Sequence, residues 1–195
     1  LLALSLTGAS LATPLGLPAD PPFRVYSAAD GLNQKAAQAL AQDSKGLLWI
    51  GSYGGLNQFN GSTFKSLTTR HGLRQNFITD LLVDDSDRIW AGDAAGGLTL
   101  IDNGAVTLTA EPLEGYPGTI RAMTVLDDYI YMGTEPGSLR RISMKFPERG
   151  IEYIAEMPGE IGRMVATADG ELLMLGLESF YRFDPESEEA PILLD

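Results

Sequence analysis

The sequence contains no cysteine in its 195 residues and only one histidine, His71. The absence of cysteine excludes disulfide scaffolds, thiolate metal sites and cysteine nucleophiles, and it fits an oxidising compartment. Basic residues are also scarce: 14 Lys and Arg face 26 Asp and Glu, so the net charge is −12. Because affinity for phosphate depends on clustered basic side chains, this balance argues against nucleic acid and anionic membrane surfaces as partners.

Charge is also missing from residues 1–19, which are small and apolar, and the first charged residue is Asp20. Gly and Pro interrupt this stretch, and it is too short to span a bilayer well. It resembles the apolar and cleavage regions of a secretory signal without its basic start, with Ser10-Leu11-Ala12 as the cleavage-like site. We therefore expect residues 1–19 to be a signal peptide remnant and the chain to be an exported fragment. An ordinary disordered tail is the alternative.

What the chain does contain is an internal repeat of about 41 residues. The segment that starts at Gly31 aligns without a gap with the segment that starts at Gly72. Four copies share a large residue followed two positions later by Gly: Trp49 and Gly51, Trp90 and Gly92, Tyr131 and Gly133, and Met174 and Gly176. A period of this length decides the architecture, and it fills residues 31–195.

Within each copy, four short runs of β-type residues are separated by turn residues. In the second copy, for example, Asp84–Asp87 and Asn103-Gly104 are turns, and the latter is of the hairpin type. Four short antiparallel strands in about 42 residues are the unit of a β-propeller blade. The segment 34–42 has local helix propensity, but its gapless register with the strand of the second copy overrides that propensity.

We therefore predict an all-β fold, a β-propeller of four-stranded antiparallel blades, over residues 20–195. The four blades are expected at about 31–67, 72–109, 119–156 and 160–194. Strands A to D are named from the innermost strand outwards. Strand A is expected near 36–42, 77–83, 120–126 and 161–167, strand B near 47–51, 88–92, 129–133 and 172–176, strand C near 56–59, 98–101, 139–142 and 180–183, and strand D near 63–67, 105–109, 151–156 and 191–194.

One outer-type strand, at 23–26, precedes the first blade and has no blade of its own. Propellers often close by pairing such a strand with the last blade, which hides two sheet edges. Because the fourth blade already has an outer strand at 191–194, we expect further blades in the intact protein, about seven in all, and self-association of the isolated chain. A closed ring of four blades is the alternative.

The repeat also resembles a known family. The first copy carries D-G-L at 30–32, A-Q-D-S-K-G-L-L-W-I-G at 41–51 and G-L-N-Q-F-N-G at 55–61. These motifs resemble the two-component regulator propeller repeat, and the second copy, with I-W-A-G at 89–92, resembles it nearly as well. Copies three and four depart from it, because Tyr131 and Met174 replace Trp.

Proteins of that family are bacterial transmembrane receptors. In them a periplasmic propeller precedes an immunoglobulin-like domain, a membrane helix and a cytoplasmic histidine kinase or diguanylate cyclase. The resemblance implies a periplasmic, ligand-binding sensor propeller of an inner-membrane protein. It also implies that the downstream segments of the same protein are its partners, and that the full-length receptor is a candidate homodimer.

The repeated aromatic residues could be stacking platforms for sugars or bases, but their position in mid-strand in every copy favours packing between blades. The glycines two residues later, Gly176 included, are interpreted as positions where strand B ends in a tight turn. The acidic turn at 84–87 lacks the Gly and distal Glu of an EF-hand loop. We interpret it as a solvated hairpin turn and predict no metal site.

Catalytic residues find little support. Either a Ser-His-Asp triad or a His-ligand metal site would have to be built around His71, whose position favours a role in a turn. No Gly-rich phosphate loop leads from a strand into a helix, so we predict no nucleotide site and no cofactor.

Binding residues are expected at one face of the blades. In an A-B-C-D meander the D–A and B–C connections emerge together, on what we call the DA/BC face, and the A–B and C–D connections emerge on the opposite AB/CD face. Loops on a rigid scaffold commonly carry binding, and those of the DA/BC face are richer in long polar and aromatic side chains. The candidate ligand-binding residues are Asn33, Gln34, Lys35, Tyr53, His71, Arg74, Gln75, Asn76, Asp93, Tyr116 and Glu135.

The leading hypothesis is a non-enzymatic extracytoplasmic sensor of an unknown small ligand. Saccharides are the candidate class, because Tyr and Asn side chains suit hydroxyl-rich ligands. The alternative is a secreted propeller enzyme such as a polysaccharide or streptogramin-type lyase, which needs a positioned base and an electrophile. One His and scattered Arg residues give it little support. An interaction scaffold without a small ligand is a third hypothesis that composition leaves open.

Overall fold

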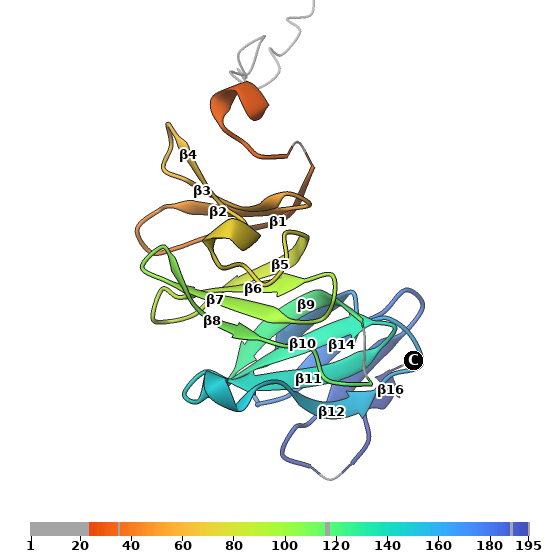
Figure 1. The fold of residues 1–195 in the computed structure, drawn as a ribbon. Helices are drawn as coiled ribbons and strands as arrows, with labels where there is room; N and C mark the ends of the chain where they lie inside the picture. The colour runs from red at the N-terminus through yellow and green to blue at the C-terminus, as the bar shows by residue number, and fades with distance from the viewer. Residues whose placement is uncertain (1–23, 35, 116–117, 188, 195) are drawn as a thin grey trace, which may run out of the picture.

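Four antiparallel sheets of four strands each follow one another along the chain and form an open arc (Figure 1). The structure is a computed structural model, and it describes residues 24–34, 36–115, 118–187 and 189–194. The predicted β-propeller fold with four-stranded blades is thereby confirmed. The strands differ from the expected ranges by at most two residues at either end. The number of blades in the intact protein stays a prediction.

Each blade is a meander in which sequence neighbours pair. Blade 1 contains β1 (Ala37–Gln42), β2 (Leu48–Ser52), β3 (Gly55–Phe59) and β4 (Phe64–Leu67). Blade 2 contains β5 (Ile78–Val83), β6 (Ile89–Asp93), β7 (Leu98–Asp102) and β8 (Ala105–Ala110). Blade 3 contains β9 (Thr119–Leu126), β10 (Tyr129–Glu135), β11 (Ser138–Ser143) and β12 (Glu152–Glu156), and blade 4 contains β13 (Arg163–Ala166), β14 (Leu172–Leu175), β15 (Phe180–Phe183) and β16 (Ile192–Leu194).

The first strand of every blade is the innermost one, because β1 contacts β5, β5 contacts β9, and β9 contacts β13. Three short 3-10 helices, η1 (Ala28–Asp30), η2 (Thr69–His71) and η3 (Pro147–Arg149), lie in the connections outside the sheets. None of the helices in the described part of the chain is long and apolar enough to cross a membrane.

Hydrophobic side chains are buried between blades rather than within them. Trp49 and Leu56 of blade 1 share one core cluster with Ile78 and Ile89 of blade 2. A second cluster joins blades 2 and 3 around Trp90, and a third joins blades 3 and 4. Each sheet therefore depends on its neighbour for burial, as in other repeat architectures.

The glycines that follow the large residue of each B strand serve this packing. They lie inside β2, β6 and β10 rather than at a turn, which corrects the reason we expected for them. A Cβ on Gly51 would lie 2.7 Å from Cγ2 of Ile78, and a Cβ on Gly92 would lie 2.8 Å from Cγ2 of Ile120. Gly133 meets Ile161 in the same way. Glycine therefore lets the next blade approach closely, through the innermost strand in blades 2 and 3 and through Ile161, just before β13, in blade 4.

Blade 4 departs from this arrangement, and its predicted register is wrong by one residue. In blades 1 to 3 the glycine pairs with the first Leu of strand C, in the pairs Gly51–Leu56, Gly92–Leu98 and Gly133–Leu139. The corresponding pair in blade 4 is Leu175–Phe180. Leu175 therefore replaces the glycine and Leu173 replaces the aromatic residue, whereas Gly176 lies just beyond β14. Since a slip of one residue exchanges the two faces of a strand, Met174 is buried against blade 3.

The segment before blade 1 also differs from expectation. Residues 24–26, the described part of the predicted outer strand 23–26, are not in a strand. A strand needs a hydrogen-bonding neighbour, and no strand in the described part of the chain pairs with this segment. Tyr26 instead packs edge-on against Phe59 and Phe64, with ring centroids 4.8 and 5.4 Å away. The predicted signal peptide remnant, 1–19, lies outside the described residues.

Candidate functional site

Asn33, a predicted ligand-binding residue of the DA/BC face, has its side chain occupied by the fold. Its amide Nδ2 donates to the carbonyl oxygen of Gly54 (2.9 Å). Its Oδ1 accepts from Nδ2 of Asn57 (2.7 Å) and from Oγ of Ser52 (3.1 Å). Asn33 therefore clamps the loop that enters blade 1 onto the β2–β3 hairpin.

Arg74 occupies the equivalent position in the second copy and has the same role with different chemistry. Its Nε donates to Oδ2 of Asp93 (2.7 Å) and its Nη2 to Oδ1 (2.5 Å). Asp93 is almost fully buried, and Arg74 also pairs with Glu111. Burial alone lowers the pKa of Arg74, but the hydrogen bonds and charges of Asp93 and Glu111 outweigh it and raise the pKa. This pair of predicted ligand-binding residues is thus a structural ion pair.

Two further predicted residues, His71 and Asn76, stabilise the turn that enters blade 2. The ring Nδ1 of His71 accepts from the backbone N–H of Thr68 (3.1 Å) and caps η2. Oδ1 of Asn76 accepts from the backbone N–H of Thr69 (2.9 Å). Both side chains are therefore committed to local structure.

The other predicted residues are spread over the DA/BC face. Tyr53 is half exposed and packs on Phe77, with ring centroids 4.2 Å apart across the junction of blades 1 and 2. Gln34 is exposed, Glu135 pairs with Arg121, and Oε1 of Gln75 is buried without a hydrogen-bond partner. Lys35 and Tyr116 lie outside the described residues. Of the predicted set, the structure therefore pairs Arg74 with Asp93, but it does not bring the described members together in a single cluster.

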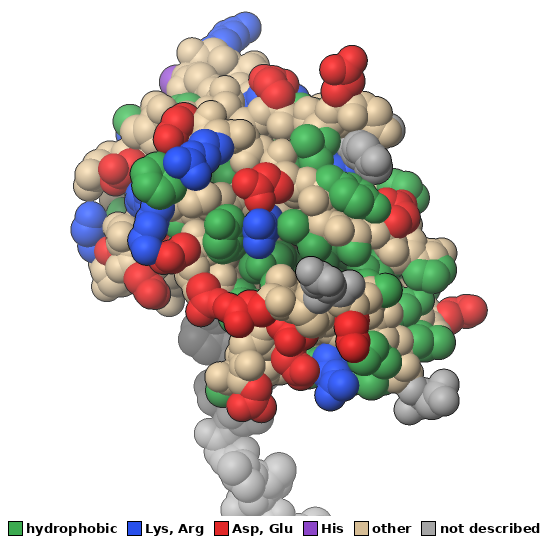
Figure 2. Space-filling view, turned by 90° about the horizontal axis from the view of Figure 1, so that it is seen from below, with side chains coloured by type: hydrophobic (Ala, Val, Ile, Leu, Met, Phe, Trp, Pro, Cys, Tyr) green, Lys and Arg blue, Asp and Glu red, His purple; other side chains and the backbone are tan. Residues whose placement is uncertain are grey.

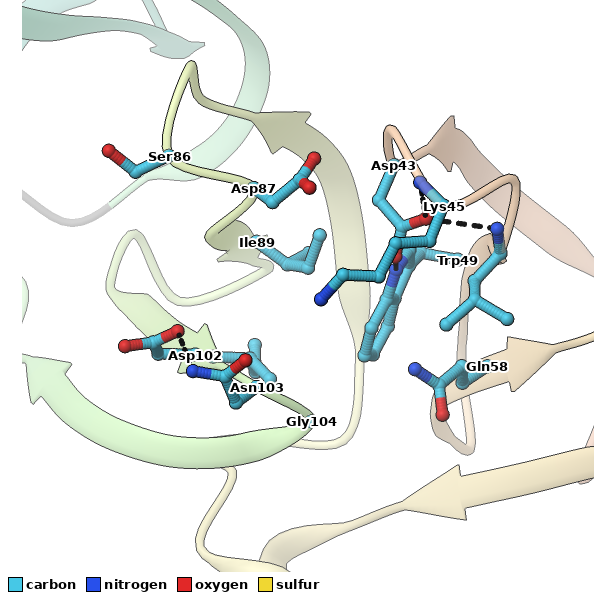
Figure 3. Close-up of a pocket in the computed structure, with 12 residues that line it drawn as sticks. Asp43, Lys45, Trp49, Gln58, Ser86, Asp87, Ile89, Asp102, Asn103 and Gly104 are labelled. Carbon is cyan, nitrogen blue, oxygen red and sulfur yellow. Dashed lines mark hydrogen bonds between the residues drawn. The ribbon is translucent and has the colours of Figure 1, made fainter.

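The opposite AB/CD face holds a hollow that the sequence did not reveal. It lies between blades 1 and 2 and has a volume of about 270 Å³ (Figure 3). Polar side chains at its rim are Lys45, Gln58, Asp87, Asp102 and Asn103, and the apolar lining is formed by Trp49, Ile89 and Ile101. We call it the blade 1–2 hollow.

Three hydrogen bonds between the blades frame this hollow. The backbone N–H of Ser44 donates to Oδ1 of Asp87 (2.9 Å), and Oγ of Ser44 bonds to Oδ2 of the same carboxylate. These hydrogen bonds lower the pKa of Asp87. On the outer side, Nζ of Lys65 lies 3.4 Å from the carbonyl oxygen of Gly104. The rim therefore holds a fixed carboxylate, while Lys45 and Gln58 keep their side-chain donors available.

Sequence reasoning missed the residue that fixes the aromatic lining. Oδ2 of Asp43 accepts from the indole Nε1 of Trp49 (3.0 Å), and Oδ2 of Asp84 accepts from Trp90 (2.9 Å). The other oxygen of each carboxylate accepts backbone N–H groups within its own turn. An Asp six residues before each Trp was the available signal.

An equivalent hollow lies between blades 3 and 4, with a volume of about 590 Å³. Its lining includes Tyr129, Tyr131 and several carboxylates, among them Asp128 and Asp184. Arg141 lies over the ring of Tyr129, 4.3 Å from its centroid, and Nε of Arg141 donates to Glu152 (2.8 Å). Burial raises the pKa of Tyr131. The cation of this hollow is therefore already paired, and its rim is acidic.

Arg88 spans the junction of blades 2 and 3 at the corresponding place. Its Nε donates to Oδ2 of Asp84 (2.8 Å), its Nη2 donates to the carbonyl oxygen of Met144 (3.2 Å), and its guanidinium lies over Trp90. At this position blade 1 has Leu47 and blade 3 has Tyr129. Arg88 therefore ties blade 2 to blade 3 on this face, and Arg140 of β11 also donates across the same junction, to the carbonyl oxygen of Gly96 (3.4 Å).

The comparisons with known proteins agree with this architecture. Residues 31–54 match the family model of the two component regulator propeller. This segment is similar to one repeat of that propeller family. It coincides with β1, β2 and the loop that enters blade 1, so it contains the Asp43–Trp49 pair and Gly51.

The chain spans only part of the length of the proteins that it matches. A segment of 43 residues is 44% identical to Histidine kinase P4 of Formosa agariphila and covers 22% of this chain and 3% of that protein. The extracellular domain of a protein described as a hybrid two component system from B. thetaiotaomicron superposes with a TM-score of 0.68 at 18% identity, over 82% of this chain and 22% of that one. A streptogramin B lyase superposes with a TM-score of 0.67 at 12% identity, over 84% and 56%.

The propeller repeats also place one acid where an apolar residue is usual. Asp80 lies on β5, the innermost strand of blade 2, where the equivalent residues are Ala39 and Ala122. Burial raises its pKa to about 6, although the backbone N–H groups of Leu81 and Met123 and the charge of Arg163 act in the opposite direction. No group of three His, Cys, Asp or Glu residues in the described ranges is arranged to hold a metal ion.

Proposed function

We propose that this chain is the ligand-sensing propeller of a bacterial transmembrane signalling receptor, that it lies outside the cytoplasm, and that it is not itself an enzyme. The observation that carries the proposal is the two component regulator propeller repeat at 31–54. The likeness to an extracellular domain of a hybrid two component system supports it. In this proposal a histidine kinase or diguanylate cyclase, an immunoglobulin-like domain and a membrane segment belong to other parts of the same protein.

The ligand site of the proposed sensor is the blade 1–2 hollow. Its volume is near the lower end of the range for small-molecule sites, about 300 Å³. Gln58 and Lys45 carry donors that no other described side chain uses, and Asp102 and Asn103 face the same space in Figure 3. Since two blades meet here, a ligand in the hollow contacts both and can bias their relative position.

Saccharides fit this lining best. Amide, carboxylate and ammonium groups around one rim can donate to and accept from several hydroxyl groups at once. Ile89, Ile101 and Trp49 lie beneath these groups and are almost fully buried, so the polar rim would make most of the contacts with a sugar. The mixture of charges matches a neutral hydroxyl-rich ligand better than a phosphate or an amine.

A lyase activity receives less support from the same residues. The lyase with a similar fold shares 12% sequence identity, which supports the fold alone. His71, the sole imidazole, is engaged in capping η2 on the DA/BC face. It is therefore not placed to act as a base in the blade 1–2 hollow.

The test is a binding screen of the 195-residue chain against neutral di- and trisaccharides, read by thermal shift and then by calorimetric titration. We expect at least one saccharide to raise the melting temperature. The variant Gln58→Leu is expected to weaken its binding at least tenfold, because it removes a donor and an acceptor from the rim. The matched control is Gln34→Leu, which makes the same change on the DA/BC face.

Two results would contradict the proposal. A panel without any thermal shift would reject saccharides as the ligand class. Binding that is lost in Gln34→Leu and retained in Gln58→Leu would place the site on the DA/BC face, where the sequence predicted it.

A further inference from the structure

The hollow between blades 3 and 4, which we call the blade 3–4 hollow, offers room for a second ligand. Its volume of about 590 Å³ lies within the range of small-molecule sites, about 300–1,000 Å³. Both of its walls are formed by neighbouring blades of the arc: Tyr129, Tyr131 and Arg141 belong to blade 3, and Asp184 and Glu186 belong to the C–D loop of blade 4. The blade 3–4 hollow is thus separate from the proposed saccharide site, which lies at another junction.

Two tyrosine rings form the aromatic part of this lining. The ring centroids of Tyr129 and Tyr131 lie 6.4 Å apart, and the ring planes are inclined by 58°. Tyr131 is buried, whereas Tyr129 is partly exposed. A cation already lies against this surface, because Cζ of Arg141 is 4.3 Å from the centroid of Tyr129. The aromatic part of the hollow is therefore suited to a positively charged group.

The rim carries more negative charge than the nearby cations neutralise. Arg141 pairs with Glu152 (2.8 Å), and Lys145 pairs with Asp128 (2.6 Å). The remaining acidic side chains of the lining form no ion pair with any described residue: Asp127, Asp169, Asp184 and Glu186. Asp and Glu side chains also form a band across the lower part of the view from below, with few Lys and Arg side chains among them (Figure 2). The hollow therefore attracts cations and repels anions.

The neighbouring junction of blades 2 and 3 already holds a guanidinium group on the same face. Cζ of Arg88 lies 5.5 Å from the ring centroid of Trp90. Nε of Arg88 donates to Oδ2 of Asp84 (2.8 Å), and Nη2 donates to the carbonyl oxygen of Met144 in the C–D loop of blade 3 (3.2 Å). Blade 3 has Tyr129 at the position of Arg88, so strand B supplies no such cation to the blade 3–4 hollow. Aromatic rings, carboxylates and the C–D loop of the next blade are nevertheless present there.

We propose that the blade 3–4 hollow binds a small organic cation that carries a guanidinium group. The guanidinium lies against the tyrosine rings, as Arg88 lies against Trp90, and its N–H groups donate to the carboxylates of the rim. A guanidinium is planar, stacks on aromatic rings and pairs with a carboxylate through two hydrogen bonds, whereas an ammonium is a strongly hydrated point charge. A guanidinium ligand is therefore preferred to a primary amine of similar length.

Other ligand classes fit this hollow less well. A metal ion needs several oxygen ligands that converge on one point, and no group of three His, Cys, Asp or Glu residues in the described part of the chain is arranged in that way. An anion would face the unpaired carboxylates of the rim, and a neutral sugar would leave their charge without a counterpart.

The first test is calorimetric titration of the whole chain with agmatine, which has a guanidinium at one end and an ammonium at the other. We expect agmatine to bind, and putrescine, which has an ammonium at both ends, to bind about fivefold more weakly. The double variant Asp169→Asn, Asp184→Asn is expected to weaken agmatine binding about three- to tenfold, because it removes two charges from the rim. Asparagine retains the acceptor with which Oδ1 of Asp184 holds the backbone N–H of Glu186 (2.9 Å). The matched control is Asp85→Asn, Glu178→Gln, which removes the same charge from exposed positions outside the hollow.

The second test supplies the missing cation from the chain itself. Tyr129→Arg places an arginine at the position that Arg88 has in blade 2, and it is expected to abolish agmatine binding because its own guanidinium enters the hollow. The control is Tyr129→Leu, which copies Leu47 of blade 1, removes one ring and leaves the space open. It is expected to weaken agmatine binding only about threefold. Circular dichroism of each variant checks that it is folded.

Three outcomes would overturn the proposal. One is the absence of agmatine binding to the unmodified chain. Another is an equal loss of binding in the rim variant and its control, which would indicate attraction to the net negative charge alone. The third is equal binding of agmatine and putrescine, which would reject the guanidinium. The result does not depend on the saccharide screen, because Gln58→Leu changes only the blade 1–2 hollow and should leave agmatine binding unchanged.

Discussion

Blades 1 and 4 close the same A–B turn with different side chains. In blade 1, Oδ1 of Asp43 accepts from the backbone N–H of Leu47 (2.9 Å), and in blade 4 Oγ1 of Thr167 accepts from that of Glu171 (3.1 Å). Asp43 has a second oxygen for the indole N–H of Trp49, whereas blade 4 has Leu173 in place of the Trp. In this comparison, the turn has an aspartate where the N–H of a buried indole needs a hydrogen-bond acceptor, and a threonine where there is no indole.

The same two blades differ in how they meet the next sheet. Blade 1 has Gly51 and a large aromatic ring, and it packs closely on blade 2. Blade 4 has Leu175 and Leu173, and its outer face is exposed. Three features of the repeat therefore occur together. The Trp, the Asp that accepts from its indole and the Gly are all present in blades 1 and 2, and all three are replaced in blade 4.

The largest effect is expected from the aromatic residue. Trp90→Ala is expected to lower the free energy of unfolding by about 3–5 kcal/mol, and Trp49→Ala by a similar amount, because each removes a large buried side chain. Leu173→Ala should cost clearly less, since Leu173 is only partly buried. Urea denaturation measures all three. Unchanged stability of Trp90→Ala would contradict the role of this ring in packing between blades.

The acceptor comes next. Asp84→Ala is expected to lower the free energy of unfolding by about 2–3 kcal/mol, because it leaves the indole N–H of Trp90 without a partner, breaks the ion pair with Arg88 and removes the turn hydrogen bond. Thr167→Ala removes only a turn hydrogen bond, and about 1 kcal/mol is expected. Denaturant titration of both variants sharpens the comparison, and equal losses would contradict the second role of the aspartate.

The innermost strands provide a pH-dependent contrast, because Asp80 of blade 2 and Arg163 of blade 4 occupy equivalent positions. Burial raises the pKa of Asp80 to about 6, above the value of about 4 in an unfolded chain. The unfolded state therefore loses its proton first, and stability falls as pH rises from about 4 to 6. Asp80→Asn is expected to be more stable than the unmodified chain at pH 7, by about 2 kcal/mol.

Unfolding measured in steps from pH 4 to pH 7 checks this expectation. Arg163→Gln is the matched control, because it removes the opposing charge without removing the acid. A difference between Asp80→Asn and the unmodified chain that does not change with pH would contradict the raised pKa.

The smallest effect is expected at the glycine. Gly92→Ala is expected to cost about 1–2 kcal/mol, because the added Cβ would lie 2.8 Å from Cγ2 of Ile120 and that side chain must shift. At Gly159 an added Cβ meets nothing within 4 Å, so Gly159→Ala serves as a control without loss. Thermal unfolding distinguishes the two, and an unchanged melting temperature for Gly92→Ala would remove the packing argument for the repeated glycine.

Most of the fold could be predicted from the sequence, because a gapless alignment of two copies carries strand positions and turns from one copy to the next. The fourth copy was misplaced because Gly176 served as the anchor. The register is defined by which residues pair between neighbouring strands. Leu175, which pairs with Phe180, therefore occupies the position that glycine has in the other blades. Residues 24–26 are not in a strand, because a strand needs a hydrogen-bonding neighbour. The local sequence does not show whether such a neighbour is present.

The candidate site was much less predictable. Asn33, Arg74 and Asp93 are polar or charged, which suggested binding, yet their hydrogen bonds hold the entry loops to the B–C hairpins. The blade 1–2 hollow is formed mainly by turns from two copies, at 43–47, 86–87 and 102–104, and each of these turns has an ordinary sequence. The size of the hollow depends on the distance between the sheets of blades 1 and 2, and that distance cannot be derived from the sequence pattern of either repeat.

The central claim is that each blade is stabilised by its neighbours rather than by a core of its own. Residue-resolved amide hydrogen exchange, at a dilution where the chain is monomeric, tests it most directly. Blades 2 and 3 are covered on both faces, so β6, β7, β10 and β11 should exchange most slowly, while β14 and β15 of blade 4 exchange faster. Equal protection of blade 4 and blades 2 and 3 would contradict the account.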